Sequence, residues 1–169
     1  MQNLIEDVEL SFKLFEFSVR TMCYAELDKI DVESFGNDLQ LNLPEENVSF
    51  PTGDFLDSEN VIRFSQMSVG TAFGATAICL DCLLENSSTE DPNLQSIKSL
   101  VGAIRNAFSH GIAMPCWYIK KHKYEKIDLA FVNGPVIDLE ELNGKVFYYQ
   151  QIGGLALWYR IKEYAIKNT

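Results

Sequence analysis

Residues 92–111 read PNLQSIKSLVGAIRNAFSHG and carry the helical pattern that decides the fold. Apolar side chains recur here at spacings of three and four residues, which is typical of a helix with one face in the core. They are Leu94, Ile97, Leu100, Val101, Ile104 and Phe108. Pro92 suits the first turn of a helix, where an N–H would have no partner. Gly111 is expected to end the helix as a left-handed C-terminal glycine.

Three more helices are predicted outward from this stretch. The same periodicity predicts helices over residues 3–29, about 57–84 and about 146–167. Asp57 or Ser58 is expected to cap the second of these. In that helix Gly70 and Gly74 lie one turn apart. This spacing indicates close approach by another helix, either from the same chain or from a second subunit.

The remaining segments have other patterns. Residues 30–56 are rich in acids, proline and glycine, which predicts a long acidic loop or a partly ordered segment. Period-two alternation predicts strands over 116–119 and 126–132, joined as a hairpin by the tip at 121–123, and a short third strand over 136–139. The expected fold is therefore mainly α: an up-and-down helical bundle in one domain, 1–169, with a small antiparallel hairpin or sheet insertion at about 115–140.

Composition places the chain among ordinary globular proteins. Apolar residues make up 47% of it and charged residues 22%. The most apolar stretch, 69–84, is interrupted by glycines, threonines and Asp81, which argues against a membrane span. The first residues are acidic rather than basic, unlike a signal peptide. We therefore expect a cytoplasmic protein with reduced cysteines and no membrane partner.

Cys79 and Cys82 form a CxxC pair within the apolar run AICLDCLL. Burial of two small side chains on one helix face explains the pair better than a zinc site, because neither Cys23 nor Cys116 supplies a second ligand pair. The sequence therefore predicts no metal and no cofactor.

Charge is divided unevenly along the chain. The net charge is -10, which by itself argues against a nucleic-acid binder. Residues 1–60 hold 14 acids and 3 bases, whereas the segment 98–126 holds a single acid, Glu125. The bases of that segment are Lys98, Arg105, Lys120, Lys121, Lys123 and Lys126. These lysines either bind phosphates or only solvate a hairpin tip. One hypothesis is that the acidic segment 30–56 mimics RNA and covers them.

The residues best suited to chemistry lie at the end of the helix described first. His110 can transfer protons near neutral pH, and Arg105 offers a planar fork of donors that suits a phosphate or a developing phosphorane. Asn106 lies one turn before His110 and can orient its ring or donate to an oxyanion. A surface arginine and a histidine that bonds a terminal carbonyl would give the same pattern without function.

The segment Arg105-Asn106-Ala107-Phe108-Ser109-His110 resembles the hallmark motif of the HEPN superfamily, an Arg, often followed by Asn, and a His four to six residues later. The resemblance extends loosely over the helices from 57 to 111 and the last helix. It implies a helical bundle that forms a homodimer, with both motifs in one composite site at the interface. It also implies metal-independent endoribonuclease activity, in a toxin or a phage-defence effector, through attack by the RNA 2′-hydroxyl.

Roles follow from the resemblance by position. His110 would be the general base or acid, Arg105 would stabilise the phosphorane and Asn106 would position the pair, with Ser109, Lys120, Lys121 and Lys123 as binding residues. Ile112 stands where toxins paired with a nucleotidyltransferase antitoxin have a tyrosine, so the chain departs from that subgroup, although an antitoxin partner stays open.

The sequence leaves open whether the chain is an enzyme. The alternatives are a non-catalytic HEPN-like module that binds a nucleotide, RNA or a partner protein, and an unrelated helical interaction domain. Asp81 either faces the site and holds Arg105 or His110, or lies on the surface.

Overall fold

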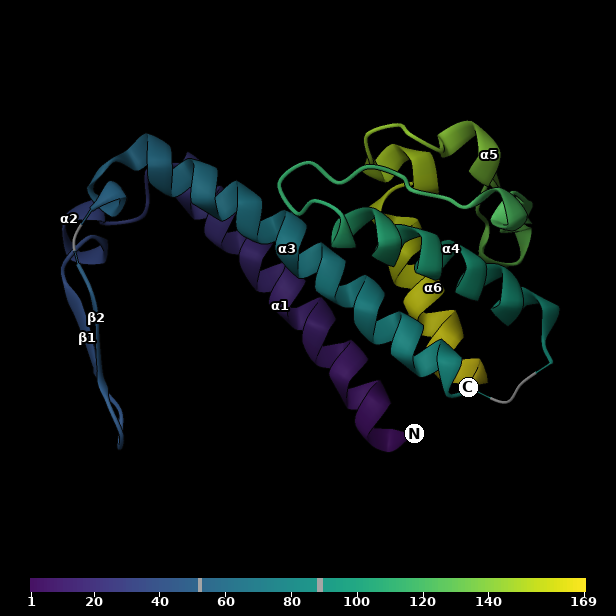
Figure 1. The fold of residues 1–169 in the computed structure, drawn as a ribbon, viewed down its shortest axis with the longest axis horizontal. Helices are drawn as coiled ribbons and strands as arrows, with labels where there is room; N and C mark the ends of the chain where they lie inside the picture. Colours follow the sequence, from purple (N-terminus) through teal and green to yellow (C-terminus); the bar gives the residue numbers. More distant parts are fainter. Residues whose placement is uncertain (52, 88–89) are drawn as a thin grey trace. The chain divides into compact units, whose positions relative to one another are not determined.

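The computed structural model describes residues 1–51, 53–87 and 90–169 (Figure 1). These residues form two compact units, one of residues 1–14 with 70–169 and the other of residues 15–69. The helices α1 (Gln2–Glu26) and α3 (Ser58–Glu85) contribute to both units.

The protein is mainly helical, as predicted. Besides α1 and α3, the long helices are α4 (Pro92–Ser109) and α6 (Leu155–Asn168), and the short ones are α2 (Val32–Phe35) and α5 (Leu139–Leu142). The strands form small antiparallel sheets of two strands each. The long helices follow the predicted ones to within a few residues, except for the start of α6.

Side-chain capping fixes where two helices begin. Asp57 accepts a hydrogen bond from the backbone N–H of Glu59 at 3.0 Å, so it caps α3. Asp91 does the same for α4 through Asn93, with Pro92 in the first turn. The C-cap of α4 is His110, in a right-handed conformation. Gly111 does not adopt a left-handed conformation, so the prediction of a left-handed terminal glycine was wrong.

Aromatic packing forms the core of the unit built from residues 1–14 and 70–169. Trp158 of α6 is fully buried and stacks on Phe12 of α1, with ring centroids 6.3 Å apart. Its indole N–H donates to the Thr76 hydroxyl of α3 at 2.9 Å, which satisfies the one polar atom of a buried side chain. This core fixes the positions of α3 and α6 within the unit.

A glycine allows α3 and α4 to approach closely. A Cβ atom on Gly74 would lie 3.1 Å from the Phe108 ring of α4, closer than ordinary van der Waals contact. The close approach predicted at Gly74 is therefore made by a helix of the same chain. It presses the C-terminal turn of α4, which carries the motif, against α3.

The predicted hairpin has other partners in the structure. The antiparallel pair is β3 (Lys126–Asp128) with β4 (Val136–Asp138). Residues 116–119 instead meet the chain near Val146, which bridges to Cys116. The predicted pairing of 116–119 with 126–132 was therefore wrong. Cys116 pairs with Val146, about 30 residues further along the chain, and local alternation cannot indicate so distant a partner.

The last helix begins later than predicted. Gly153 and Gly154 have φ values of 83° and 84°, which place both in the left-handed region. Residues Tyr149–Ile152 form a 3₁₀ turn (η4), and α6 starts only at Leu155. The predicted start at 146 was wrong for this reason.

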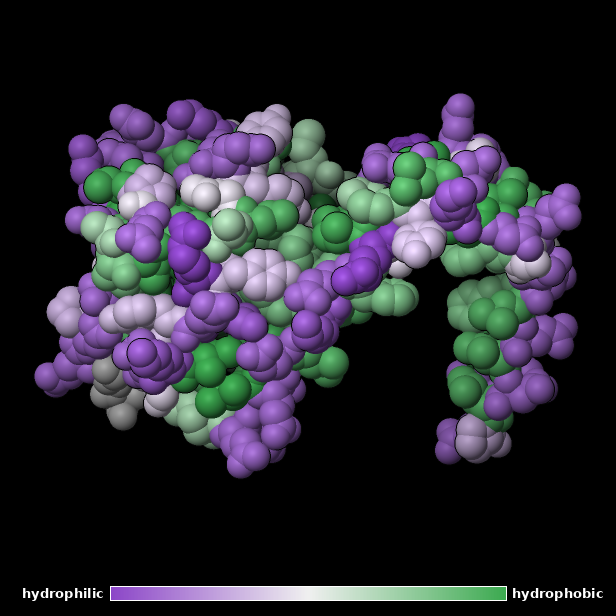
Figure 2. Space-filling model, turned by 180° about the vertical axis from the view of Figure 1, so that it is seen from behind, coloured by the Kyte–Doolittle hydropathy of each residue, from purple (hydrophilic) through white to green (hydrophobic). Residues whose placement is uncertain are grey.

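The unit of residues 15–69 contains a hairpin where a loop was expected. Strands β1 (Leu39–Asn42) and β2 (Asn47–Phe50) pair antiparallel, with Leu39 opposite Phe50 and Leu41 opposite Val48. These four side chains share one face, since directly opposite residues point to the same side of a sheet. Figure 2 shows hydrophobic surface along one side of this hairpin. The prediction of a loop over 30–56 was therefore wrong for the residues of β1 and β2. Thr52 lies outside the described residues.

One helix among the described residues, α3, is long and apolar enough to cross a membrane by length and composition. Half of its most apolar stretch is buried inside the protein. Length and composition alone are weak evidence for a membrane span, because core helices of soluble proteins share them.

Candidate functional site

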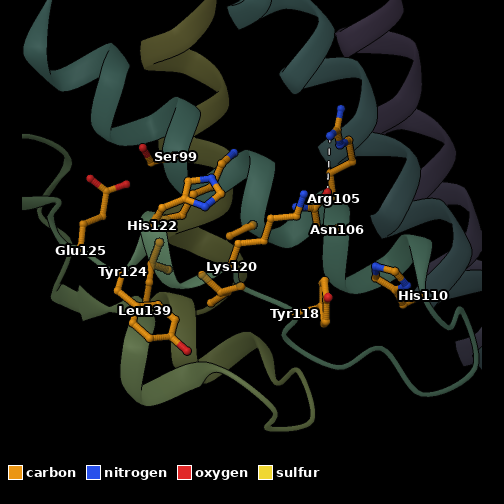
Figure 3. Close-up of a pocket in the computed structure, with 13 residues that line it drawn as sticks. Ser99, Arg105, Asn106, His110, Tyr118, Lys120, His122, Tyr124, Glu125 and Leu139 are labelled. Carbon is orange, nitrogen blue, oxygen red and sulfur yellow. Dashed lines mark hydrogen bonds between the residues drawn. The ribbon is translucent and has the colours of Figure 1, made fainter.

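The predicted motif lies at the C-terminal end of α4 (Figure 3). His110 is exposed where the helix stops, and Arg105 and Asn106 are half-buried more than a turn earlier. In Figure 3 the Arg105 side chain extends away from His110, and its guanidinium donates a long hydrogen bond of 3.4 Å to the Asn106 side-chain oxygen. The two motif residues therefore share a site without pointing at one another.

A buried carboxylate holds Arg105. Asp81 of α3 accepts a hydrogen bond from the Arg105 guanidinium at 2.6 Å, and the Asp81 side chain is only 5% exposed. Of the alternatives for Asp81, a contact with Arg105 is confirmed, and a place on the surface was wrong. Because a charge-assisted bond fixes the guanidinium in direction as well as in position, Asp81 determines where Arg105 can act.

Burial raises the pKa of Asp81 above its ordinary value, and nearby charges act on it in both directions. The Arg105 guanidinium lowers this pKa, Glu85 raises it, and Lys98 and Lys123 lower it. The largest cause is the removal of the carboxylate from water, which disfavours its charged form. Asp81 therefore binds a proton more tightly in the folded chain than in the unfolded one.

This pKa shift predicts how Asp81→Asn changes stability with pH. Since the folded state holds the Asp81 proton more tightly, the free energy of unfolding should lose the contribution of this proton as pH rises from the ordinary aspartate pKa through the raised one. The asparagine variant keeps an oxygen that can accept from Arg105 and has no such loss. Wild type should therefore become less stable relative to Asp81→Asn between acid and neutral pH, as measured by urea unfolding.

A matched substitution, Asp128→Asn, gives the effect of removing one negative charge from an exposed aspartate. A stability difference between wild type and Asp81→Asn that stays constant with pH, or that moves in the opposite direction, would contradict the prediction.

A cavity of about 660 Å³ adjoins the motif. Its size is within the usual range for a small-molecule or nucleotide site. Basic or protonatable side chains line much of it, and Glu125 is its one acid. The basic and protonatable residues are Arg105, His110, Lys120, His122 and Lys123. Arg105, Lys120 and Lys123 concentrate positive charge at this cavity on a chain of net charge -10, which suits an anionic ligand.

A second, more apolar depression, here called the apolar groove, lies on the other side of the motif. It has a volume of about 540 Å³, and Arg105 and His110 line it too. Its other lining residues come from α3 and the chain after α4: Thr71, Gly74, Ala75, Ile78, Phe108, Ser109, Gly111 and Ile112. Ile78 and Ile112 are each 51% exposed. The motif therefore separates a basic cavity from an apolar groove.

The structure brings together most of the residues predicted for the site. Arg105, Asn106 and His110 line the basic cavity with two of the predicted lysines, Lys120 and Lys123. Two others are placed differently. Lys121 is exposed and does not line the basic cavity. Ser109 lines the apolar groove and donates to the backbone oxygen of Asn106 at 2.8 Å.

Sequence reasoning did not propose Tyr118 as a residue of the site, although its side chain lines the cavity. The Tyr118 ring lies against His110, with centroids 4.8 Å apart and planes tilted by 59°. The sequence did contain a signal, because Tyr118 is the exposed member of an alternating stretch between the buried Trp117 and Ile119.

Within the described residues, no cluster of three or more His, Cys, Asp or Glu side chains is arranged to hold a metal ion. Cys79 is half-buried and Cys82 is exposed, so the prediction that both thiols are buried was wrong for Cys82.

Comparison of the chain with protein-family models, curated proteins and solved structures found no significant match.

Proposed function

We propose that the chain is a HEPN-like, metal-independent endoribonuclease that cleaves RNA through attack by the 2′-hydroxyl. The observation that carries the proposal is the shared lining of one basic cavity by Arg105, Asn106 and His110. An imidazole can move the protons of such a reaction, and a guanidinium can stabilise the charge that develops on the phosphate. Lys120 and Lys123 would hold the neighbouring phosphates of the strand.

The proposal includes a homodimer with a composite site. In one copy the Arg105 side chain extends away from His110, so a second copy would supply the missing partner of each residue. The apolar groove beside the motif offers a surface for such a copy, because Ile78 and Ile112 expose apolar area directly next to His110. A cytoplasmic location, a role in toxin or phage-defence systems and an antitoxin partner belong to the same proposal.

A second candidate is a non-catalytic module of the same type that binds a nucleotide, RNA or a partner protein. One observation favours it: the Arg105 guanidinium is already bound to the buried Asp81, which reduces the charge it can offer to a transition state. The basic cavity would then bind an anionic ligand without reaction.

The two candidates are distinguished by an RNA cleavage assay in the presence of excess EDTA. We expect cleavage to continue and to leave a cyclic phosphate, because the proposed reaction uses only side chains and the substrate's own hydroxyl. Loss of cleavage on addition of EDTA would show that the proposed metal-independent mechanism is wrong. RNA binding without any cleavage would support the second candidate, the non-catalytic binding module.

Arg105→Ala is expected to reduce this cleavage about 10²–10³-fold, since it removes a positive group from the developing phosphorane. The comparison variant is Arg63→Ala, which removes an exposed arginine of α3 that does not line the cavity. If both variants cleave RNA at the wild-type rate, Arg105 has no part in the reaction.

A further inference from the structure

An exposed aromatic ring stands at the edge of the basic cavity. Tyr118 is 56% exposed, lines the cavity and lies beside His110. Figure 3 shows it between Lys120 and His110. The ring therefore offers a large apolar face with a polar hydroxyl at the edge of a charged cavity.

Hydrogen bonds on both sides of Tyr118 fix its backbone. The Trp117 N–H donates to the backbone oxygen of Lys145 at 2.8 Å, and the Gly144 N–H donates to the backbone oxygen of Trp117 at 2.8 Å. The Ile119 N–H donates to the Asn143 side chain at 2.9 Å. Tyr118 is therefore presented by an ordered segment.

Burial of the neighbouring side chains sets the direction of the ring. Trp117 and Ile119 are 1% and 6% exposed, so the extended chain turns Tyr118 and Lys120 to the opposite, outer side. The indole N–H of Trp117 also donates to the Gln151 side chain at 2.8 Å. An aromatic ring, a lysine and the motif histidine are thus held next to one another.

We propose that Tyr118 is a base-stacking subsite, and that the ligand of the cavity is single-stranded RNA with one unpaired base on the Tyr118 ring. The phosphate attached to that nucleotide lies toward His110 and Lys120. This inference rests on the proposed function, because it names the substrate class of the same site.

The chemistry of stacking selects single strands. A base in a duplex has both faces covered by its neighbours, so its π-face reaches an aromatic side chain only when the nucleotide is unpaired. Stacking tolerates any base, because every base has a π-face. The subsite therefore selects for an unpaired nucleotide and discriminates weakly among the four bases.

The test combines a protein variant with a substrate variant. The ligand is a fluorescent single-stranded decamer of 2′-O-methyl uridine, which lacks the 2′-hydroxyl that the proposed cleavage requires. In a series of variants of this decamer, an abasic nucleotide is placed at each position in turn. In wild type, one abasic position should weaken binding about 5- to 150-fold, the usual effect of losing one stacked base. Tyr118→Ala should weaken binding of the intact decamer by a similar factor and should show no further loss with that abasic position.

Two further variants separate stacking from other effects. Tyr118→Phe keeps the ring and should bind as wild type does. Tyr148→Ala removes a tyrosine that is similarly exposed, at 60%, but does not line the cavity, and it should leave binding unchanged. Thermal unfolding of each variant shows whether it is folded.

The outcomes distinguish this inference from the proposed function. No binding of the decamer by wild type, or additive losses from Tyr118→Ala and the abasic position, would overturn the stacking subsite even if RNA is cleaved. If the losses of binding affinity are non-additive but wild type does not cleave RNA, the stacking subsite is supported and only the proposed nuclease activity is wrong. A duplex that binds as tightly as the single strand would also overturn it.

Discussion

Replacing His110 by alanine is expected to lower the rate of metal-free RNA cleavage by about 10²–10⁴-fold, the usual contribution of a general acid or base. The imidazole is exposed at the C-terminal end of α4 and lines the basic cavity, so it can reach a 2′-hydroxyl or a leaving oxygen. Because the side chain is exposed, the substitution should change the free energy of unfolding little. Single-turnover cleavage and urea unfolding measure the two quantities separately.

The second histidine of the chain is the matched control. His122 lines the same cavity but lies outside the motif, within the 3₁₀ turn Lys121–Lys123. His122→Ala should affect RNA binding modestly and leave the single-turnover rate at saturating RNA unchanged. If His110→Ala cleaves RNA as fast as wild type, the proposed mechanism is wrong.

Mixed subunits test the composite site. A symmetric composite site contains two His110–Arg105 pairs. If each pair takes His110 from one copy and Arg105 from the other, mixing the inactive His110→Ala and Arg105→Ala chains regenerates one intact pair per mixed dimer. At equal amounts, about a quarter of the wild-type activity should return. If each site uses both residues of a single copy, none should return. Light scattering of the separate chains shows whether dimers form.

The long helices were predictable because their signal is local. Spacings of three and four apolar residues extend over many turns in α1, α3 and α4, and Asp57 and Pro92 mark two of the starts. The start of α6 was not found, since two left-handed glycines interrupt a segment whose apolar pattern continues through them. The β1–β2 hairpin was not found either, because the acids, prolines and glycines of residues 30–56 favoured a loop.

The residues of the site also fall into two groups, those with a local signal in the sequence and those whose partners lie far away in the chain. Asn106 and His110 are four residues apart at the end of α4, so their shared helix face could be inferred from spacing. Arg105 is five residues from His110, about 140° around an ideal helix, so spacing did not give the direction of its side chain. The partners that define their geometry come from elsewhere in the chain. Asp81 pairs with Arg105 from 24 residues away, and Tyr118 reaches His110 only because residues 117–119 bond to residues 143–145. Local spacing left both alternatives for Asp81 open and named no partner for Tyr118, because each contact joins segments that lie far apart in the sequence.

The largest loss of stability is expected from Phe73→Ala. Phe73 of α3 is fully buried, and four other rings surround it at centroid distances of 4.8–5.5 Å. They are Phe108, Phe147, Tyr149 and Trp158. The substitution removes the central ring of this cluster and leaves a cavity that the neighbours can fill only in part. It should therefore lower the free energy of unfolding by about 3–5 kcal/mol.

Urea unfolding measures this loss, and Ile78→Ala is the control on the same helix. Ile78 is 51% exposed, so its truncation should change the free energy of unfolding by at most about 1 kcal/mol. Equal losses in the two variants would show that Phe73 is not at the centre of the core.

The Phe73 ring also supports the site, since it contacts Phe108, two residues before His110 on the last turn of α4. Loss of the ring removes one of the contacts that hold this turn against α3, so the turn should open more often than the start of α4. Hydrogen exchange of the backbone N–H groups at 106–110 should therefore increase more in Phe73→Ala than exchange at 97–101. Uniform acceleration along α4 would indicate that the core and the motif unfold only together, and that Phe73 stabilises the whole unit without positioning His110 separately.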